Sequence, residues 1–194
     1  LYLSNSNNNT LTNIIANSNS NTGIYLSISN NNTIKDSKFQ GNARYGIDLY
    51  LSSNNLIYNN LFNNTYNFYF EGTIYTNYWN TTRQPGTRIY SFGNEIGGNY
   101  WTNPTGNGFS DTCTDANADG FCDSYYELSA TGPNRDYLPL SNKYPATDTT
   151  PPTYSLNSTN STLAGTPVEH RLKWTDDVGL SGFIFSFDNC TGTF

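Results

Sequence analysis

The residues whose types and spacing most directly suggest chemistry lie between positions 115 and 123. The segment Asp-Ala-Asn-Ala-Asp-Gly-Phe-Cys-Asp places oxygen-bearing side chains at Asp115, Asn117, Asp119 and Asp123, with Gly120 among them. The order matches an EF-hand-type loop, in which oxygen ligands hold Ca²⁺ and a glycine permits the sharp turn. The carbonyl of Phe121 would supply a further ligand. We therefore expect a structural, non-catalytic calcium ion in this loop.

The end of the loop departs from this pattern. The position that usually carries a bidentate Glu is occupied by Tyr126, and Glu127 comes one residue later. The alternative is an Asp-, Asn- and Gly-rich surface turn that holds no metal, and the sequence leaves both interpretations open.

Two cysteines bracket the same loop. A disulfide between Cys113 and Cys122 would close a short loop and stabilise the fold by up to ~3 kcal/mol in the chain-entropy model. It would also indicate an oxidising compartment, whereas two reduced thiols would indicate the cytosol. We expect the disulfide. Cys190 is left over, and we expect its partner to lie outside this sequence.

The segments that must position this loop repeat every 23 residues. Apolar residues recur in three columns, which are Leu1–Leu3, Ile24–Leu26 and Ile47–Leu49; Leu11, Ile34 and Ile57; and Ala16, Phe39 and Phe62. Asn pairs recur at one offset, at 8–9, 31–32 and 54–55. A fixed period of this length is typical of a solenoid, in which each coil buries its apolar face against its neighbours.

The residue pattern within each coil predicts β-strands. Apolar and other residues alternate with period two after Gly23 and Gly46, and no helical stripe is sustained. Asn tolerates the left-handed backbone of sharp corners, and stacked Asn side chains can hydrogen-bond from coil to coil. The sequence thus predicts an all-β fold, a right-handed parallel β-helix. A fourth coil fits with two residues deleted, which places Phe68 and Phe70 above Ile47 and Leu49.

We expect four parts along the chain. Residues 1–92 form the β-helix coils, and 93–147 form an Asn-, Gly- and Asp-rich capping segment with the calcium loop and the disulfide. A Pro/Thr linker follows at 148–153. Residues 154–194 read as the opening of an antiparallel β-sandwich, because apolar residues alternate from Val168 to Trp174 and from Phe183 to Phe187. We also expect the sequence to be a piece of a longer protein, because Leu1 falls inside a repeat.

Composition restricts the function. The formal net charge of −6 and the absence of a basic cluster argue against a nucleic-acid partner. No apolar run approaches the ~20 residues of a membrane-spanning helix. Together with the expected disulfide, these features favour an extracellular or cell-surface location.

The repeats of the form Gly-Ile-x-Leu…Asn-Asn-x-Ile…Phe-x-Asn resemble those of the NosD-like right-handed β-helix proteins. The resemblance is most specific at Ile96–Trp101, Gly108–Asp111, Asp119–Asp123 and Asp136–Leu140, which are similar to the segment that closes the β-helix in secreted or surface-anchored prokaryotic members. Asp148–Pro152 and Trp174–Phe194 resemble the start of an immunoglobulin-like module attached to such proteins, which implies that residues 154–194 are the N-terminal part of an Ig-like β-sandwich. The family label implies copper handling. Copper prefers Cys, Met or His ligands, whereas this chain has no Met, one His and three Cys, so we expect no copper.

The function hypotheses fall into two classes. The first is a non-catalytic β-helix protein with a structural, adhesive or carbohydrate-contacting role, whose partners would be cell-surface glycans or other envelope proteins. Outward rings such as Tyr25 and Tyr69 suit stacking on sugars. The second is a polysaccharide lyase or hydrolase, a class that often uses this fold. Because the column of Asp48 holds Tyr25 and Tyr69 and no second acid, we favour the non-catalytic role and predict no catalytic residue; an enzyme would need active-site coils outside this sequence.

Overall fold

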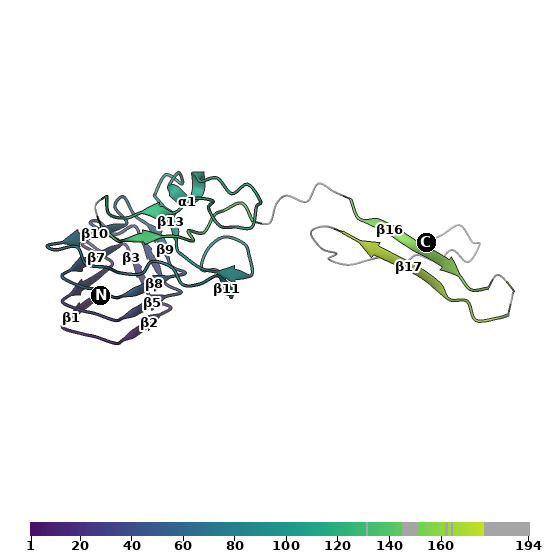
Figure 1. The fold of residues 1–194 in the computed structure, drawn as a ribbon, viewed down its shortest axis with the longest axis horizontal. Helices are drawn as coiled ribbons and strands as arrows, with labels where there is room; N and C mark the ends of the chain where they lie inside the picture. The colour runs from purple at the N-terminus through teal and green to yellow at the C-terminus, as the bar shows by residue number, and fades with distance from the viewer. Residues whose placement is uncertain (131, 145–150, 162, 164, 177–194) are drawn as a thin grey trace. The chain divides into compact units, whose positions relative to one another are not determined.

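The structure is a computed structural model that describes residues 1–130, 132–144, 151–161, 163 and 165–176. The chain divides into two compact units, Leu1–Ala146 and Thr147–Phe194 (Figure 1). The first unit contains the repeats and the capping segment. Each unit is described by itself below.

The first unit is a parallel β-helix of about three turns, as the 23-residue period predicts. Each turn contributes one short strand to each of three parallel sheets. The first sheet contains β1 (Tyr2–Ser4), β4 (Ile24–Ser27), β7 (Ile47–Tyr50) and β10 (Phe68–Glu71); the second contains β2 (Thr10–Thr12), β5 (Thr33–Lys35) and β8 (Leu56–Tyr58); the third contains β3 (Ile15–Asn17), β6 (Lys38–Gln40), β9 (Leu61–Asn63) and β13 (Tyr100–Thr102).

The strand register confirms the columns that the sequence predicts. Ile24 pairs with Ile47, Leu11 with Ile34, and Phe39 with Phe62. The two-residue deletion is confirmed as well, because β10 sets Phe68 against Ile47.

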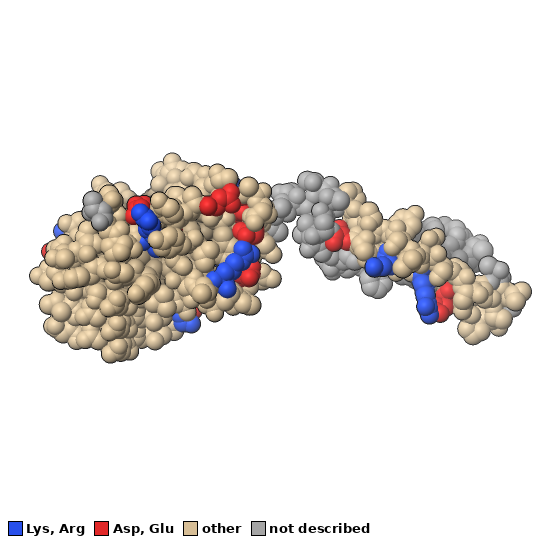
Figure 2. Space-filling view, viewed as in Figure 1, with Lys and Arg blue, Asp and Glu red and all other residues tan. Residues whose placement is uncertain are grey.

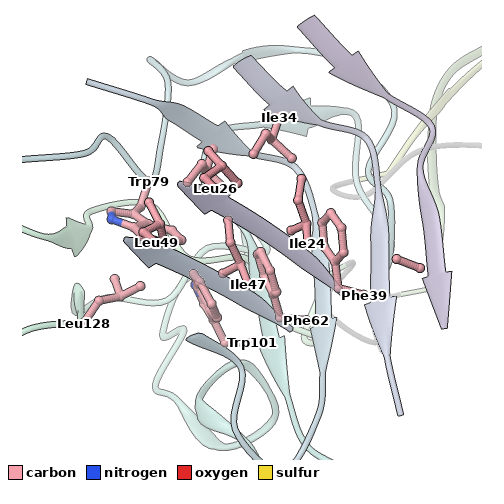
Figure 3. Packing of buried hydrophobic residues seen from close by; sticks show 12 residues of the cluster. Ile24, Leu26, Ile34, Phe39, Ile47, Leu49, Phe62, Trp79, Trp101 and Leu128 are labelled. Atoms are coloured by element: carbon pink, nitrogen blue, oxygen red, sulfur yellow. The ribbon is translucent and has the colours of Figure 1, made fainter. Parts of the chain in front are cut away.

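The core lies inside the coils. Ile24, Leu26 and their counterparts in the next coil are almost fully buried, while the residues between them face outward. Figure 3 shows Phe39, Phe62 and Trp101 following one another along the helix axis, and stacked ring centroids 5.2 Å and 4.6 Å apart join successive members. Because each ring covers the one before it, the core is continuous from coil to coil.

Asparagine side chains connect the coils along the corners, and Asn32, Asn55 and Asn77 are buried. Asn9, Asn32, Asn55 and Asn77 form one ladder, in which each Nδ2 donates to the Oδ1 of the next at 2.9–3.0 Å. The first Asn of each predicted pair has a left-handed backbone, with φ of 60° at Asn8 and 56° at Asn31 and Asn54. The Asn pairs thus have two functions, since one residue makes the corner and the next makes the ladder.

The capping segment contributes to the solenoid itself. Its strand β13 pairs in parallel with β9, and Trp101 extends the aromatic column. The carboxylate of Asp136, fully buried, accepts from the Asn99 backbone N–H at 2.8 Å and from the Trp101 indole N–H at 2.8 Å.

The remaining elements are β11 (Gln84–Pro85) with β12 (Glu95–Ile96), helix α1 (Phe109–Thr112), and β14 (Tyr126–Glu127) with β15 (Arg135–Asp136).

The second unit contains an antiparallel pair of β16 (Thr153–Thr159) and β17 (His170–Thr175), with a register shift between Ser155 and Ser158. The alternating run that ends at Trp174 is therefore a strand. An Ig-like sandwich is not confirmed, because the predicted strand at Phe183–Phe187, like Cys190 and most of the 148–153 linker, falls outside the described residues.

Candidate functional site

The cap loop from Asp115 to Asp123 is closed by hydrogen bonds from its own backbone. Buried Asp115 accepts from the N–H groups of Asp119 and Gly120 at 3.1 Å and 2.9 Å, and from the Ser141 hydroxyl at 2.6 Å. Gly120 has a φ of +83°, which a glycine adopts without the strain that other residues incur. The predicted glycine turn is therefore present.

The other predicted ligands follow the same pattern. The side-chain oxygens of Asn117 and Asp119 accept from backbone N–H groups two residues further on, at 3.3 Å and 3.0 Å, and Asp123 accepts from the Ala116 N–H at 3.1 Å. The loop thus winds around its own carboxyl and amide oxygens. Among the residues that the structure describes, however, no three His, Cys, Asp or Glu side chains are gathered as a metal site.

Two arginines reach the loop, and the sequence analysis did not anticipate them. Arg83 donates to Asp119 Oδ2 at 2.6 Å, and Arg88 donates to the Gly120 carbonyl at 2.7 Å. Burial acts to raise the pKa of Asp119, but hydrogen bonds from Arg83 and the Phe121 N–H outweigh it and lower the pKa. Both guanidinium groups also lie 4.6 Å from the centroid of the Phe121 ring. The loop is therefore already contacted by cations of the protein.

Cys113 and Cys122 form a disulfide across this loop, with their Cα atoms 5.6 Å apart. The bond joins the end of helix α1 to the loop. Both cysteines are largely buried.

The second candidate site is the outer face of the sheet formed by β1, β4, β7 and β10. Tyr2, Tyr25, Asp48 and Tyr69 stand in one row across the four strands. The Tyr2 and Tyr25 rings stack with centroids 5.3 Å apart, and Tyr69 stacks on Tyr45 at 4.6 Å. The two predicted sugar-contacting tyrosines thus belong to two separate ring pairs, with Asp48 between them in the row.

Asp48 is the unusual residue of this face. Although it lies on the outer side of β7, it is only 4% exposed, and its Oδ1 has no hydrogen-bond partner. Burial, and then the charge of Glu71, raise the pKa of Asp48 to about 6, while Arg44 acts in the opposite direction. A buried carboxyl oxygen without a hydrogen-bond partner is uncommon and marks a candidate functional site.

Tyr25 accounts for the burial of Asp48. Its hydroxyl donates to Glu71 Oε2 at 3.1 Å, although Tyr25 is on β4 and Glu71 is on β10. Because β7 lies between these strands, the tyrosine side chain spans the coil that carries Asp48. Burial and the bond to Glu71 raise the pKa of Tyr25 to about 12, so the phenol remains a donor at neutral pH.

The sequence analysis missed the proximity of Asp48 and Glu71. It compared residues within one column, where Asp48 meets Tyr25 and Tyr69, whereas Glu71 is two residues beyond Tyr69 and faces the same side. Both acids line one hollow of about 510 Å³, together with Leu1, Tyr2, Asn21, Thr22, Tyr25 and Arg44. A search for diagonal neighbours on the same face would have found the pair.

Charged side chains are otherwise sparse. On the face in Figure 2, red and blue groups of the first unit are few, and several adjoin one another. No helix in the described part of the chain is long and apolar enough to cross a membrane.

Comparison with known proteins gives one match. The model of a family described as "Periplasmic copper-binding protein (NosD)" matches residues 1–106, which is more than half of the chain. No curated protein and no solved structure matches.

Proposed function

This chain belongs to the NosD family, and we propose that it is a non-catalytic periplasmic or cell-surface β-helix protein that contacts carbohydrate. The observation that carries the proposal is the outer face of β1, β4, β7 and β10, where the stacked Tyr2 and Tyr25 rings line a hollow with two carboxyl groups. The second ring pair, Tyr45 and Tyr69, lies on the other side of Asp48 in the strand row. Flat rings stack on the apolar faces of sugars, and carboxyl groups accept from sugar hydroxyls. The parallel strands hold these groups on a rigid surface, which reduces the entropy lost on binding.

A glycan array with the complete chain tests this proposal. We expect binding to a subset of polysaccharides, with a loss of about tenfold or more in affinity for Tyr25→Ala. Tyr154→Ala is the control, because Tyr154 is an exposed tyrosine of the second unit. A blank array would contradict carbohydrate contact and leave a structural or adhesive role with envelope proteins as partners.

Copper does not fit the residues of this chain. The one histidine, His170, is exposed on β17, where its Nδ1 lies 2.9 Å from the Thr159 hydroxyl. Cys113 and Cys122 are joined in a disulfide and offer no thiolate, and there is no methionine. The soft and imidazole donors that copper prefers are therefore not assembled in the described residues. We derive no function that involves copper.

We also propose a structural calcium ion in the cap loop. The support is the pattern of oxygen side chains that accept from N–H groups within the loop, together with the left-handed glycine, which is the backbone arrangement of EF-hand-type loops. Arg83 competes for Asp119, so the affinity should be moderate.

Calcium titration calorimetry on the oxidised protein tests the ion. Saturable binding that disappears in Asp119→Ala is the expected result. Glu95→Gln serves as the control, because it removes the other carboxylate that pairs with Arg83 and leaves all the oxygens of the cap loop in place. If Ca²⁺ produced no heat of binding and no shift in the unfolding temperature, the calcium proposal would be wrong. Asp115–Asp123 would then be a turn that arginines stabilise.

The alternative function is a polysaccharide-processing enzyme. The observation in its favour is the shared hollow of Asp48 and Glu71, because glycoside hydrolysis uses two carboxyl groups. Incubation with polysaccharides that bind should release no reducing ends and no unsaturated products. Release that is abolished by Glu71→Gln would replace the non-catalytic proposal with the enzyme.

A further inference from the structure

The hollow on the outer face is lined by more negative than positive side chains. Two carboxyl groups line it, from β7 and β10, and the only side-chain cation among its lining residues is Arg44. Arg44 lies 5.3 Å from the centroid of the Tyr45 ring, and its charge also acts to lower the pKa of Asp48, but burial and Glu71 outweigh it.

The buried oxygen of Asp48 is the strongest single constraint. A carboxylate oxygen removed from water without a donor costs several times RT, and the cost disappears when a donor arrives. Glu71 already accepts from Tyr25, so Asp48 is the acceptor that lacks a donor. Because the Tyr25 side chain covers Asp48, a ligand in the hollow supplies the missing donor only if its N–H or O–H group reaches past that ring.

The rings beside the acids accept both cations and sugars, and the charge of Asp48 favours an ammonium group over a hydroxyl group. Tyr2 and Tyr25 stack beside the acids, and aromatic faces attract cations as well as sugar rings. A hydroxyl donor brings no positive charge to Asp48, whereas an ammonium donor forms a charge-assisted hydrogen bond to it.

We propose that this hollow binds the protonated amino group of a glucosamine-type sugar unit, with Asp48 and Glu71 as acceptors and Tyr2 and Tyr25 as ring contacts. The proposal rests on carbohydrate contact at this face and names its ligand class. The sugar ring would lie on the tyrosines while its ammonium group points to Asp48. Polymers that carry free amino groups are thus the expected ligands.

The affinity should pass through a maximum with pH. Asp48 must be ionised to hold the ammonium group, and burial and Glu71 raise its pKa to about 6 against the effect of Arg44. Tyr25 and Tyr69 flank Asp48 in the strand row, and burial and the bond to Glu71 raise the pKa of Tyr25 to about 12, far above this range. Affinity should therefore rise as pH increases through about 6 and fall again as the amine of the ligand loses its proton.

Three matched oligosaccharides test the proposal by calorimetry with the complete chain. They are β-1,4-linked oligomers of glucosamine, N-acetylglucosamine and glucose of equal length, which differ in the substituent at one ring position. We expect the glucosamine oligomer to bind at least tenfold more tightly than the other two near pH 6.5. Asp48→Asn should abolish that preference, and Glu71→Gln should weaken it.

The control is Glu169→Gln, which removes one negative charge from an exposed residue of the second unit. It should leave the preference unchanged. A preference that survives Asp48→Asn would indicate general attraction of a polycation to an acidic protein, and would overturn the proposal. Thermal unfolding of Asp48→Asn shows that any loss is not caused by misfolding.

The failure of this inference differs from the failure of the proposed function. Equal binding of all three oligomers would overturn the ammonium site and leave carbohydrate contact in place. Binding of none of the three, with a blank glycan array, would contradict both.

Discussion

At the scale of single residues, this protein depends on buried polar side chains placed along the coil corners. Asn55 is fully buried, and its amide donates to Asn77 Oδ1 and the Ser29 carbonyl. Its Oδ1 accepts from the backbone N–H and the side chain of Asn32. Every polar atom of this side chain is therefore paired, and its partners have no access to water.

Removing this amide should make the folded protein less stable. We expect Asn55→Ala to lower the free energy of unfolding by about 3 kcal/mol, because several buried groups lose their partner at once. Asn107→Ala, at an exposed site in the capping segment, should change it by less than about 0.5 kcal/mol. Urea denaturation measures both, and equal effects would show that the ladder does not stabilise the fold.

Asp48 should reduce stability at neutral pH. Its pKa rises from 3.8 to about 6 on folding, so the folded protein binds the proton more tightly than the unfolded chain. The free energy of unfolding contributed by this group should therefore decrease as pH rises from about 4 to about 6, and the penalty should remain in full above that range. Asp48→Asn should stabilise the protein by about 1–2 kcal/mol at pH 7.5 and have little effect near pH 3.5. Denaturation midpoints at the two pH values measure this, and a stabilisation independent of pH would contradict it.

At the scale of elements, the capping segment is joined to the coils by a strand. Strand β13 extends the sheet of β9, and Trp101 covers Phe62 while its indole N–H donates to buried Asp136 at 2.8 Å. The open end of the apolar column is thus covered by a residue that also links the cap to the ladders, since Asn99 donates to the same carboxylate. The disulfide and the arginines then fix the outer loop of the cap.

Trp101 should be the most sensitive position of this junction. Trp101→Ala should lower the free energy of unfolding by about 3–5 kcal/mol, because a large buried ring is lost. Trp101→Phe keeps a ring against Phe62 but removes the donor to Asp136, and should cost about 1–2 kcal/mol beyond the packing change. Thermal and chemical denaturation distinguish the two variants. If Trp101→Ala left the free energy of unfolding unchanged, β13 would not be needed to close the core.

At the scale of the whole molecule, the chain consists of two compact units. The solenoid unit contains the core, both candidate sites and the disulfide. In the described part of the second unit, β16 and β17 are exposed along their whole length.

Because the chain divides in this way, we expect the first unit to be stable without the second. A protein truncated after Ala146 should unfold within about 2 °C of the solenoid transition of the complete chain, because the residues of the buried apolar core all belong to the first unit. Differential scanning calorimetry measures both. A marked decrease after truncation would show that the second unit supports the solenoid.

The sequence by itself determined the coil, because a period of 23 residues repeats the same apolar and Asn positions and each coil must pack on the next. It also determined the corner geometry at Asn8, Asn31 and Asn54, since local steric rules govern the backbone there. The tertiary structure alone decided which residues meet between columns and between distant segments. Asp48 and Glu71 share a hollow because Glu71 is a diagonal neighbour, and Arg88 reaches Gly120 across 32 residues that follow no repeat. Repetition fixes contacts along one axis, whereas contacts that depend on side-chain reach and on an irregular cap have no periodic signal in the sequence.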